Sequence, residues 1–236
     1  MSTLPVAILA GGLGTRLHAI TARTPKALLP IAGRPFIHWQ LELLAEQGIA
    51  DVVLCLGHRA EEIRRAVGDG PGFGLRIRYS FDGAVALGTG GALQRALPAL
   101  GPAFFVLYGD SYLRCSFAAV QAAYEESRAE GLMTVFRNAN RWEPSNVLFR
   151  GGRILEYNKR TPTSEMAHVD YGLGVLSARA LQERSAGSVF DLADLYHDLC
   201  LRGGLAGWEV GERFYEIGSV AGIAETEHYL RAGMLR

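Results

Sequence analysis

The sequence predicts an α/β fold, a three-layer αβα arrangement around a mainly parallel mixed sheet. Two observations predict it. The runs 6–10, 52–56 and 103–108 are apolar throughout, which is typical of parallel strands buried on both faces. Helical patterns separate these runs, and repeated strand–helix–strand units imply right-handed crossovers and parallel pairing.

The first half of the chain alternates strands with helices. The helix that Pro35 opens places Ile37, Leu41 and Leu44 on one face. The segment 75–81 alternates apolar and polar residues, as a half-buried strand does. The predicted elements are, in order, a strand at 6–10, a helix from Pro35 to Gly48, a strand at 52–56, a helix at 60–67, a strand at 75–81, a helix at 90–97 stopped by Pro98, and a strand at 103–108.

The second half changes character. Gly151-Gly152 separates two short strand patterns and predicts a tight hairpin. The sequence shows no repeat, low-complexity stretch or linker, so it predicts one domain over 1–236. The predicted elements are, in order, a helix at 117–130, strands at 132–137, 147–150, 153–157 and 169–176, and helices at 191–201 and 220–230.

Composition disfavours several classes of protein. Among 236 residues, 24 Lys or Arg balance 24 Asp or Glu, so no basic field favours nucleic acid or a membrane surface. The three cysteines are far apart and odd in number, which fits a reduced compartment better than a disulfide framework. We expect a cytoplasmic protein, because the N-terminus lacks a signal-peptide pattern and the apolar runs are too short to span a bilayer.

The segment 8–26 is the most informative stretch of the chain. A buried strand leads to Gly11, Gly12 and Gly14, and glycines allow a backbone to wrap an anion with its amides. Arg16 and Lys26 bring two cations to the carboxyl end of this strand, the usual ligand crevice of a parallel sheet. A triphosphate attacked at its α-phosphorus needs positive charge of this kind.

Three other interpretations compete for this loop. A dinucleotide-binding fingerprint requires a glycine where the chain has Leu17. A P-loop requires Gly-Lys-Ser/Thr where the chain has Thr15-Arg16. An ordinary glycine turn with solvated cations is the third. Because the strand, the glycines, the arginine and Pro-Lys occur together, we favour a triphosphate cradle.

The string GG-x-GTRL, followed by a threonine, by PK and by a further proline, resembles the signature of sugar-1-phosphate nucleotidyltransferases. Later segments match this family in order, so the resemblance covers nearly the whole chain. It implies a Rossmann-like sheet and the reaction of an NTP with a sugar 1-phosphate to give an NDP-sugar and pyrophosphate by direct in-line attack. It also implies that Arg16 stabilises the departing pyrophosphate and that Lys26 holds the α-phosphate region and the sugar phosphate.

The resemblance assigns 1–115 to the nucleotide and 116–236 to the sugar phosphate. A second glycine cluster, LGTGGAL at 87–93, is then expected to line the base and ribose, although such a turn can also be purely structural. Asp82 stands where relatives often have Glu or Gln facing the base. The expected nucleotide-binding residues are Leu9, Ala10, Gly11, Gly12, Gly14, Thr15, Asp82, Gly88, Thr89 and Gly91.

Four residues of the second half match the sugar side of the family. Asn146 lies in Ser-Asn-Val, and Lys159 follows an Asn that replaces the family's Glu. Asp170 and Gly172 lie in HVDYGLGVL, which resembles the strand whose glycine approaches the sugar ring. Lys159 also fits a solvated loop lysine, and Asp170 also fits a satisfied core group.

Two carboxylates are candidates for a metal site. Asp110 follows an apolar strand in YGDS, where the resemblance implies an Mg²⁺ ligand, although a turn or cap residue fits the same pattern. The family's second ligand is an Asp in a late Asp-x-Gly-Thr segment, which here reads FYEIGS and supplies Glu216. Both side chains offer the oxygen donors that Mg²⁺ prefers. The histidines and cysteines show no metal-ligand spacing.

Mg²⁺ is therefore the expected cofactor, and an NTP and a sugar 1-phosphate are the expected partners. GTP with a heptose or mannose-type 1-phosphate is favoured, because the strings LAGGLGTRL, GRPF and LGTGGA look closest to heptose-1-phosphate guanylyltransferases. A cytidylyl- or uridylyltransferase acting on another sugar or alcohol phosphate stays open, as do a non-catalytic nucleotide-sugar sensor and a homo-oligomeric state. The presence of Arg16, Lys26, Asp110 and Glu216 argues against the sensor. Neither nucleic acid nor a membrane is an expected partner.

Overall fold

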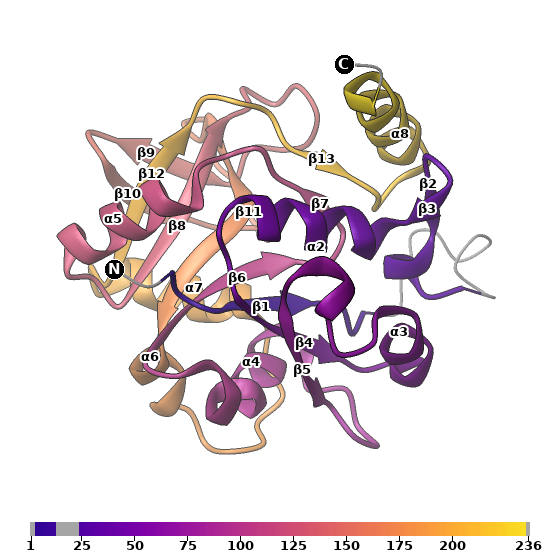
Figure 1. Cartoon of the computed structure of the whole chain (residues 1–236). Helices are drawn as coiled ribbons and strands as arrows, with labels where there is room; N and C mark the ends of the chain where they lie inside the picture. The colour runs from indigo at the N-terminus through magenta and orange to yellow at the C-terminus, as the bar shows by residue number, and fades with distance from the viewer. Residues whose placement is uncertain (1–2, 13–23, 235–236) are drawn as a thin grey trace.

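The computed structural model describes residues 3–12 and 24–234. Its centre is a nine-stranded mixed sheet with strand order β5-β4-β1-β6-β11-β8-β12-β10-β9 (Figure 1). The strands of this sheet are β1 (Val6–Leu9), β4 (Asp51–Leu56), β5 (Arg76–Phe81), β6 (Ala103–Tyr108), β8 (Gly131–Arg137), β9 (Val147–Arg150), β10 (Arg153–Tyr157), β11 (His168–Ser177) and β12 (Leu205–Val210).

Helices cover both faces of the sheet. Successive residues of β1 point to opposite faces, since Val6 and Ile8 join one hydrophobic core and Ala7 joins the other. The first core is covered by α2 (Phe36–Glu46), α3 (Ala60–Val67) and α5 (Phe117–Ser127), and the second by α4 (Gly88–Leu100), α6 (Ala178–Gln182) and α7 (Leu192–Leu201). The prediction of an α/β fold with a mixed sheet is therefore confirmed.

The prediction that the sheet is mainly parallel is wrong for its second part. Strands β5, β4, β1 and β6 are parallel to one another, as predicted. Strand β11 is antiparallel to β6 and β8, and β10 is antiparallel to β12 and β9, so that β8 and β12 form the parallel pair there. The reason is that β8, β9, β10 and β11 follow one another without a crossover helix, and parallel strands need such a crossover.

Two further expectations need correction. Pro98 lies inside α4 instead of stopping it. Proline has no backbone N–H, so the helix lacks one hydrogen-bond donor near its end, but it extends to Leu100, whose side chain is buried. It ends at Gly101, which has φ 80° and whose amide donates to the carbonyl of Leu97. Strand β12 was missed because its sequence, LAGWEV, has neither a continuous apolar run nor clean alternation.

Two short strand pairs lie between the main sheet and the last helix. Strand β7 (Ser111–Tyr112) pairs with β13 (Tyr215–Glu216), and β2 (Pro30–Ile31) pairs with β3 (Arg34–Pro35). The helix α8 (Val220–Met234) lies beside these strands (Figure 1). The 3-10 helices are η2 (Lys26–Leu28) and η3 (Pro71–Phe73). The amide of Ile217 donates to the carbonyl of Asp110 at 2.9 Å, so the C-terminal segment is held against the end of β6.

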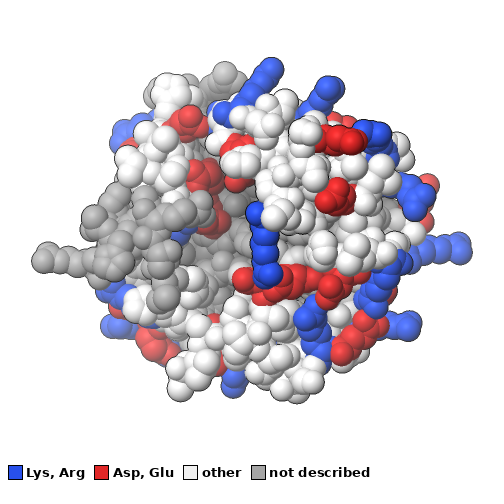
Figure 2. Space-filling model, turned by 180° about the vertical axis from the view of Figure 1, so that it is seen from behind, with Lys and Arg blue, Asp and Glu red and all other residues white. Residues whose placement is uncertain are grey.

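The surface agrees with the balanced composition. On the face shown in Figure 2, acidic and basic side chains are interspersed and form no large field of one sign. Within the described residues, no helix is long and apolar enough to cross a bilayer.

Candidate active site

A first pocket opens at the carboxyl ends of β1, β4 and β6. Leu9 lies in register with Cys55 on one side and with Tyr108 on the other. The cavity has a volume of about 380 Å³. It lies in the usual ligand crevice of parallel strands. The residues predicted from sequence that line it are Leu9, Ala10, Gly11, Gly12, Lys26, Asp82, Gly88, Thr89 and Asp110.

The start of the glycine-rich loop packs tightly against a neighbouring loop. A Cβ on Gly11 would lie 2.8 Å from the backbone nitrogen of Gly57, and a Cβ on Gly57 would lie 2.9 Å from the carbonyl oxygen of Gly11. Gly12 has open space around it. Gly11 is therefore fixed by packing, whereas Gly12 leaves room for a ligand. The predicted residues Gly14, Thr15 and Arg16 lie outside the described part of the chain.

Lys26 and Asp110 form an ion pair at one end of this pocket. The Nζ of Lys26 donates to the Oδ2 of Asp110 at 2.6 Å, and the two side chains are 16% and 30% exposed. Pro25 precedes Lys26 in an extended conformation, with φ −52° and ψ 140°. A cation and a carboxylate from distant segments are thus brought together where both can meet a ligand in the pocket.

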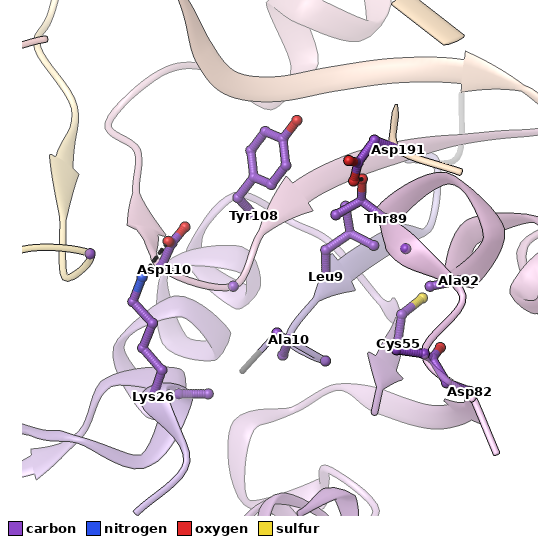
Figure 3. A pocket seen from close by; sticks show the side chains of 17 residues that line it. Leu9, Ala10, Lys26, Cys55, Asp82, Thr89, Ala92, Tyr108, Asp110 and Asp191 are labelled. Carbon is purple, nitrogen blue, oxygen red and sulfur yellow. Dashed lines mark hydrogen bonds and ion pairs between the residues drawn. The ribbon is translucent and has the colours of Figure 1, made fainter. Parts of the chain in front are cut away.

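The opposite end of the pocket contains Asp82 and Cys55 (Figure 3). Asp82 is buried, and burial raises its pKa, although the amide of Leu87 and the charge of Arg95 act to lower it. Burial and the Asp82 carboxylate together raise the pKa of the Cys55 thiol to about 12. Cys55 therefore stays protonated and is no nucleophile at neutral pH, because the thiolate is the reactive form.

The second glycine cluster has a structural cause. A Cβ on Gly88 would lie 2.5 Å from the carbonyl oxygen of Phe190, and a Cβ on Gly90 would lie 2.2 Å from the ring of Phe190. The amides of Gly90 and Gly91 both donate to that carbonyl. Gly91 does not line the pocket, in contrast to Gly88 and Thr89. The cluster thus lets α4 begin directly against the segment that leads to α7.

Asp191 is a pocket residue that we did not predict. The hydroxyl of Thr89 donates to its Oδ1 at 3.1 Å and accepts from the amide of Leu192 at 2.7 Å (Figure 3). Asp191 is the N-cap residue of α7 and lines the first pocket. From sequence it reads only as a helix start, and its contact with Thr89 depends on tertiary packing.

A second pocket, of about 390 Å³, adjoins the first. The two share Tyr108 and Asp110 as lining residues. Lys159 lies 3.3 Å from the Oδ2 of Asp170, and its ammonium lies 5.2 Å from the ring centroid of Tyr108. Burial lowers the pKa of Lys159, but Asp170 and Tyr157 raise it by more, so the net shift is upward and Lys159 is a cation at neutral pH.

Tyr108 was also missed from sequence. It ends β6 immediately before Gly109-Asp110, and it had been included only as part of an apolar run. Burial raises its pKa well above 10, and the charges of Asp170, Asp110 and Asp191 raise it further. Tyr108 therefore keeps its proton and presents a hydrogen-bond donor between the two pockets. The sequence signal that could have identified Tyr108 as a pocket residue is a side chain with a polar hydroxyl at the last position of a buried strand.

Of the other predicted sugar-side residues, one lines the second pocket and one lies behind it. Gly172, at φ 97°, lines the pocket, and a Cβ there would lie 3.3 Å from the Oγ of Ser111. Asn146 lines neither pocket. Its Oδ1 accepts from the amide of Asp170 at 3.1 Å, and its own amide donates to the carbonyl of His168. Asn146 therefore supports Asp170 from behind.

Glu216 lines the second pocket, as Asp110 does. The β7–β13 pairing places it opposite Ser111, the residue next to Asp110. Its carboxylate accepts hydrogen bonds from the amide of Gly218 and from the hydroxyl of Ser219. The two predicted metal ligands thus line one cavity, while the Glu216 carboxylate is also held at the start of α8. Within the described residues, no group of three or more His, Cys, Asp or Glu side chains is placed to hold a metal ion.

The pocket geometry places the Lys26–Asp110 ion pair in a cavity at the end of the parallel strands, beside a second cavity that carries the Lys159–Asp170 pair. Residues 6–146 match the model of the nucleotidyl transferase family. This is more than half of the chain, and the chain belongs to that family. The resemblance seen in the sequence is therefore confirmed at the level of the family.

Two relatives illustrate the range of activities within the family. The chain is 40% identical over 113 residues, 48% of its length, to the N-acetylmuramate alpha-1-phosphate uridylyltransferase of Neisseria meningitidis. It is 39% identical over 105 residues, 44% of its length, to the D-glycero-alpha-D-manno-heptose 1-phosphate guanylyltransferase of Campylobacter jejuni. These matches cover 49% and 47% of the two relatives, so the chain spans about half the length of the curated relatives that it matches. Their nucleotides differ, so similarity does not decide the base.

A solved structure confirms the fold. HddC from Yersinia pseudotuberculosis, complexed with GMP-PN, superposes with a TM-score of 0.79 over 96% of this chain and 99% of that chain. At 20% sequence identity, this likeness shows the fold alone.

Proposed function

We propose that the protein is a sugar-1-phosphate nucleotidyltransferase, which transfers a nucleoside monophosphate from an NTP to a sugar 1-phosphate and releases pyrophosphate. One observation supports this most strongly: two adjoining pockets share Tyr108 and Asp110. Each pocket also carries a lysine–aspartate pair, Lys26–Asp110 in the first and Lys159–Asp170 in the second. Two phosphorylated substrates, one bound in each pocket, would come together at the junction formed by Tyr108 and Asp110.

The chemical step is a single displacement. A phosphate oxygen of the sugar 1-phosphate forms a bond to the α-phosphorus of the NTP, and the bond from that phosphorus to the bridging oxygen of the β-phosphate breaks. Pyrophosphate leaves with the electron pair. Lys26 and Lys159 reduce the repulsion between two anions and hold them in line, which are the main contributions that proteins make to phosphoryl transfer. We propose that Arg16 also stabilises the pyrophosphate, as expected from the sequence.

The first pocket is assigned to the NTP. Leu9, Ala10, Gly11 and Gly12 line it at the end of β1, where backbone amides can meet phosphates. Gly88 and Thr89 line the other side, and we assign them to the ribose and base. We assign Gly91 to packing against the segment before α7, since it does not line the cavity.

Asp82 supports GTP as the nucleotide. An ionised carboxylate accepts hydrogen bonds and donates none. Guanine presents two adjacent donors, N1–H and the N2 amino group, to a carboxylate, whereas uracil and thymine present one N–H between two carbonyls. Asp82 is buried at the end of the pocket opposite Lys26 and Asp110, where a base would lie if the phosphates are bound beside Lys26 (Figure 3).

Mg²⁺ is the proposed cofactor, and the residues of the second pocket fit it. Asp110 and Glu216 supply carboxylate oxygens in one cavity, and Mg²⁺ is usually held by one or two carboxylates together with substrate phosphates and water. When bound, the ion would neutralise charge on the phosphate oxygens. Asp110 would be the principal protein ligand, because it lines both cavities, whereas Glu216 lines the second alone.

The second pocket is assigned to the sugar 1-phosphate. Lys159 is placed to bind its phosphate, and Asp170 and the backbone at Gly172 to bind its hydroxyl groups. We propose a heptose or mannose-type sugar, with support from the relative that acts on a heptose 1-phosphate. On this assignment, 1–115 is the nucleotide-binding half and 116–236 is the sugar-phosphate-binding half of one domain.

A product screen tests the proposal. The purified protein and Mg²⁺ are incubated with one nucleotide (ATP, CTP, GTP, UTP or dTTP) and one hexose or heptose 1-phosphate, in every combination. Products are identified by mass spectrometry. We expect a GDP-sugar and pyrophosphate as the dominant products. Nucleotide binding without an NDP-sugar from any pair would contradict the proposed activity.

A further inference from the structure

The second pocket is lined by more carboxylates than cations. Its lining includes two cationic side chains, Lys159 and Arg213. The carboxylates that line it are Asp110, Glu143, Asp170, Glu216 and Glu225. An anion that enters this cavity therefore needs one of the two cations, because like charges at close range repel.

Both cations already have carboxylate partners. Lys159 lies 3.3 Å from Asp170, whose side chain is only 4% exposed. Arg213 donates to the Oε2 of Glu225 at 2.6 Å. An arriving phosphate can compete for Lys159, which is 40% exposed and lies at the junction with the first pocket. After the phosphate has taken Lys159, Arg213 is the remaining cation among the described lining residues.

Arg213 is held in place on several sides. Its guanidinium carbon lies 4.6 Å from the ring centroid of Trp142 and 4.9 Å from that of Tyr215. Its Nε donates to the carbonyl of Phe214 at 3.3 Å. Together with the ion pair to Glu225, these contacts fix the orientation of the guanidinium, use two of its five N–H donors and compensate its charge. Arg213 is therefore poorly available to a second anionic group on a ligand.

We propose that this pocket selects an acceptor whose only anionic group is its phosphate, namely a neutral, hydroxyl-rich sugar 1-phosphate, and rejects sugars that carry a carboxylate. Glu225 enforces the selection by holding Arg213 in its ion pair. Hydroxyl groups suit this cavity because they donate to carboxylates, whereas a sugar carboxylate adds a charge that meets no available cation among the described lining residues. The inference rests on the proposed function in that the acceptor is a sugar 1-phosphate.

Binding of matched ligands tests this without turnover. Calorimetric titrations compare glucose 1-phosphate with glucuronic acid 1-phosphate, and mannose 1-phosphate with mannuronic acid 1-phosphate, because each pair differs only in whether C6 is an alcohol or a carboxylate. We expect the neutral member of each pair to bind at least about tenfold more tightly at low salt, and the gap to narrow at high salt, where exposed charges are screened. Equal or tighter binding of the uronate would overturn the inference, as would failure of all four ligands to bind.

A charge-neutralising variant tests the role assigned to Glu225. Glu225→Gln releases Arg213, so the preference for the neutral sugar is expected to fall by about fivefold, in line with the value of a partly exposed ion pair. Glu227→Gln is the matched control, since Glu227 lies two residues away on α8, pairs with Arg231 and does not line the pocket. An unchanged preference in Glu225→Gln, or an equal change in both variants, would overturn the proposal. Discrimination in binding without any NDP-sugar product would instead refute the proposed activity and leave this inference standing.

Discussion

The two pockets differ in how the chain builds them. The first is lined mainly by residues that directly follow parallel strands, so that short stretches of sequence contain most of its lining. The second draws on Tyr108, Lys159, Asp170 and Arg213, which come from four separate segments, namely the end of β6, the loop after β10, strand β11 and the loop before β13. The comparison teaches that the end of a parallel strand marks a site in the sequence, whereas a site assembled from antiparallel strands and loops leaves weaker local signals.

The largest effect is expected where the pockets meet. Asp110→Ala removes the carboxylate that lines both cavities and pairs with Lys26, so turnover should fall by about a thousandfold, within the range for loss of a group that stabilises the transition state. Initial rates of pyrophosphate release measure this. Asp51→Ala is the control, because Asp51 pairs with Arg76 at the other end of its strand. Near-full activity of Asp110→Ala would refute the claim that the reaction takes place at the junction of the two pockets.

Lys159→Met should affect the second pocket alone. Loss of its cation is expected to raise the KM for the sugar 1-phosphate by about tenfold to a hundredfold, in line with charge-assisted hydrogen bonds. The KM for the NTP should change little, since Lys159 does not line the first pocket. Steady-state kinetics with each substrate varied in turn measure both values. An equal rise in both would show that the two pockets do not divide the substrates.

Asp82→Asn should lower the preference for GTP and raise the stability of the folded protein. We expect the preference for GTP over UTP to fall about tenfold, since an amide cannot accept from both guanine donors. Because burial raises the pKa of the folded Asp82, ionisation above that pKa costs stability. The variant should therefore be more stable than the parent at pH 7, and the difference should vanish as the pH falls through the folded pKa toward the ordinary value of 3.8.

Thermal melts over this pH range and competition between the two NTPs measure the two effects. A variant that is no more stable than the parent at pH 7 would contradict the assignment of the pKa shift to burial. An unchanged GTP preference would remove the support for guanine.

Tyr108 gives the smallest expected effect. Tyr108→Leu removes the ring that lies beneath the Lys159 ammonium, and the KM for the sugar 1-phosphate should rise about threefold to fivefold. Tyr108→Phe keeps the ring and should retain most of the affinity. If Phe and Leu have the same effect, the hydroxyl and not the ring is what matters.

Much of the lining of the first pocket could be predicted from the sequence, because Leu9 to Gly12 end and directly follow a buried strand, and the ends of parallel strands meet at one edge of the sheet. The second glycine cluster shows the limit of that argument. Gly90 and Gly91 are needed to make room for Phe190 and Ser188, about a hundred residues later in the chain, so composition alone could not separate packing from binding there. Sequence proximity also could not reveal that Asp191 meets Thr89.

The second pocket was only partly predictable for a related reason. Lys159, Asp170 and Gly172 were identified by family resemblance, and the structure places all three in one cavity. Arg213 and Trp142 had no local signal, because their role depends on contacts between the segment before β13 and a distant loop. Asn146 matched a motif but lies behind Asp170, since a motif fixes the position of a residue and not the direction of its side chain.

The most direct test of the account is the stereochemistry at the α-phosphorus. No histidine lines either pocket in the described part of the chain, and the Cys55 thiol is held protonated, so the described lining residues supply neither an imidazole nor a thiolate as the nucleophile of a covalent intermediate. A single diastereomer of GTP substituted with sulfur at the α-phosphorus is converted to product, and the configuration is determined by ³¹P NMR. Direct attack by the sugar phosphate at the junction formed by Tyr108 and Asp110 predicts inversion of configuration at the α-phosphorus. Retention would contradict the account, because it requires two successive displacements.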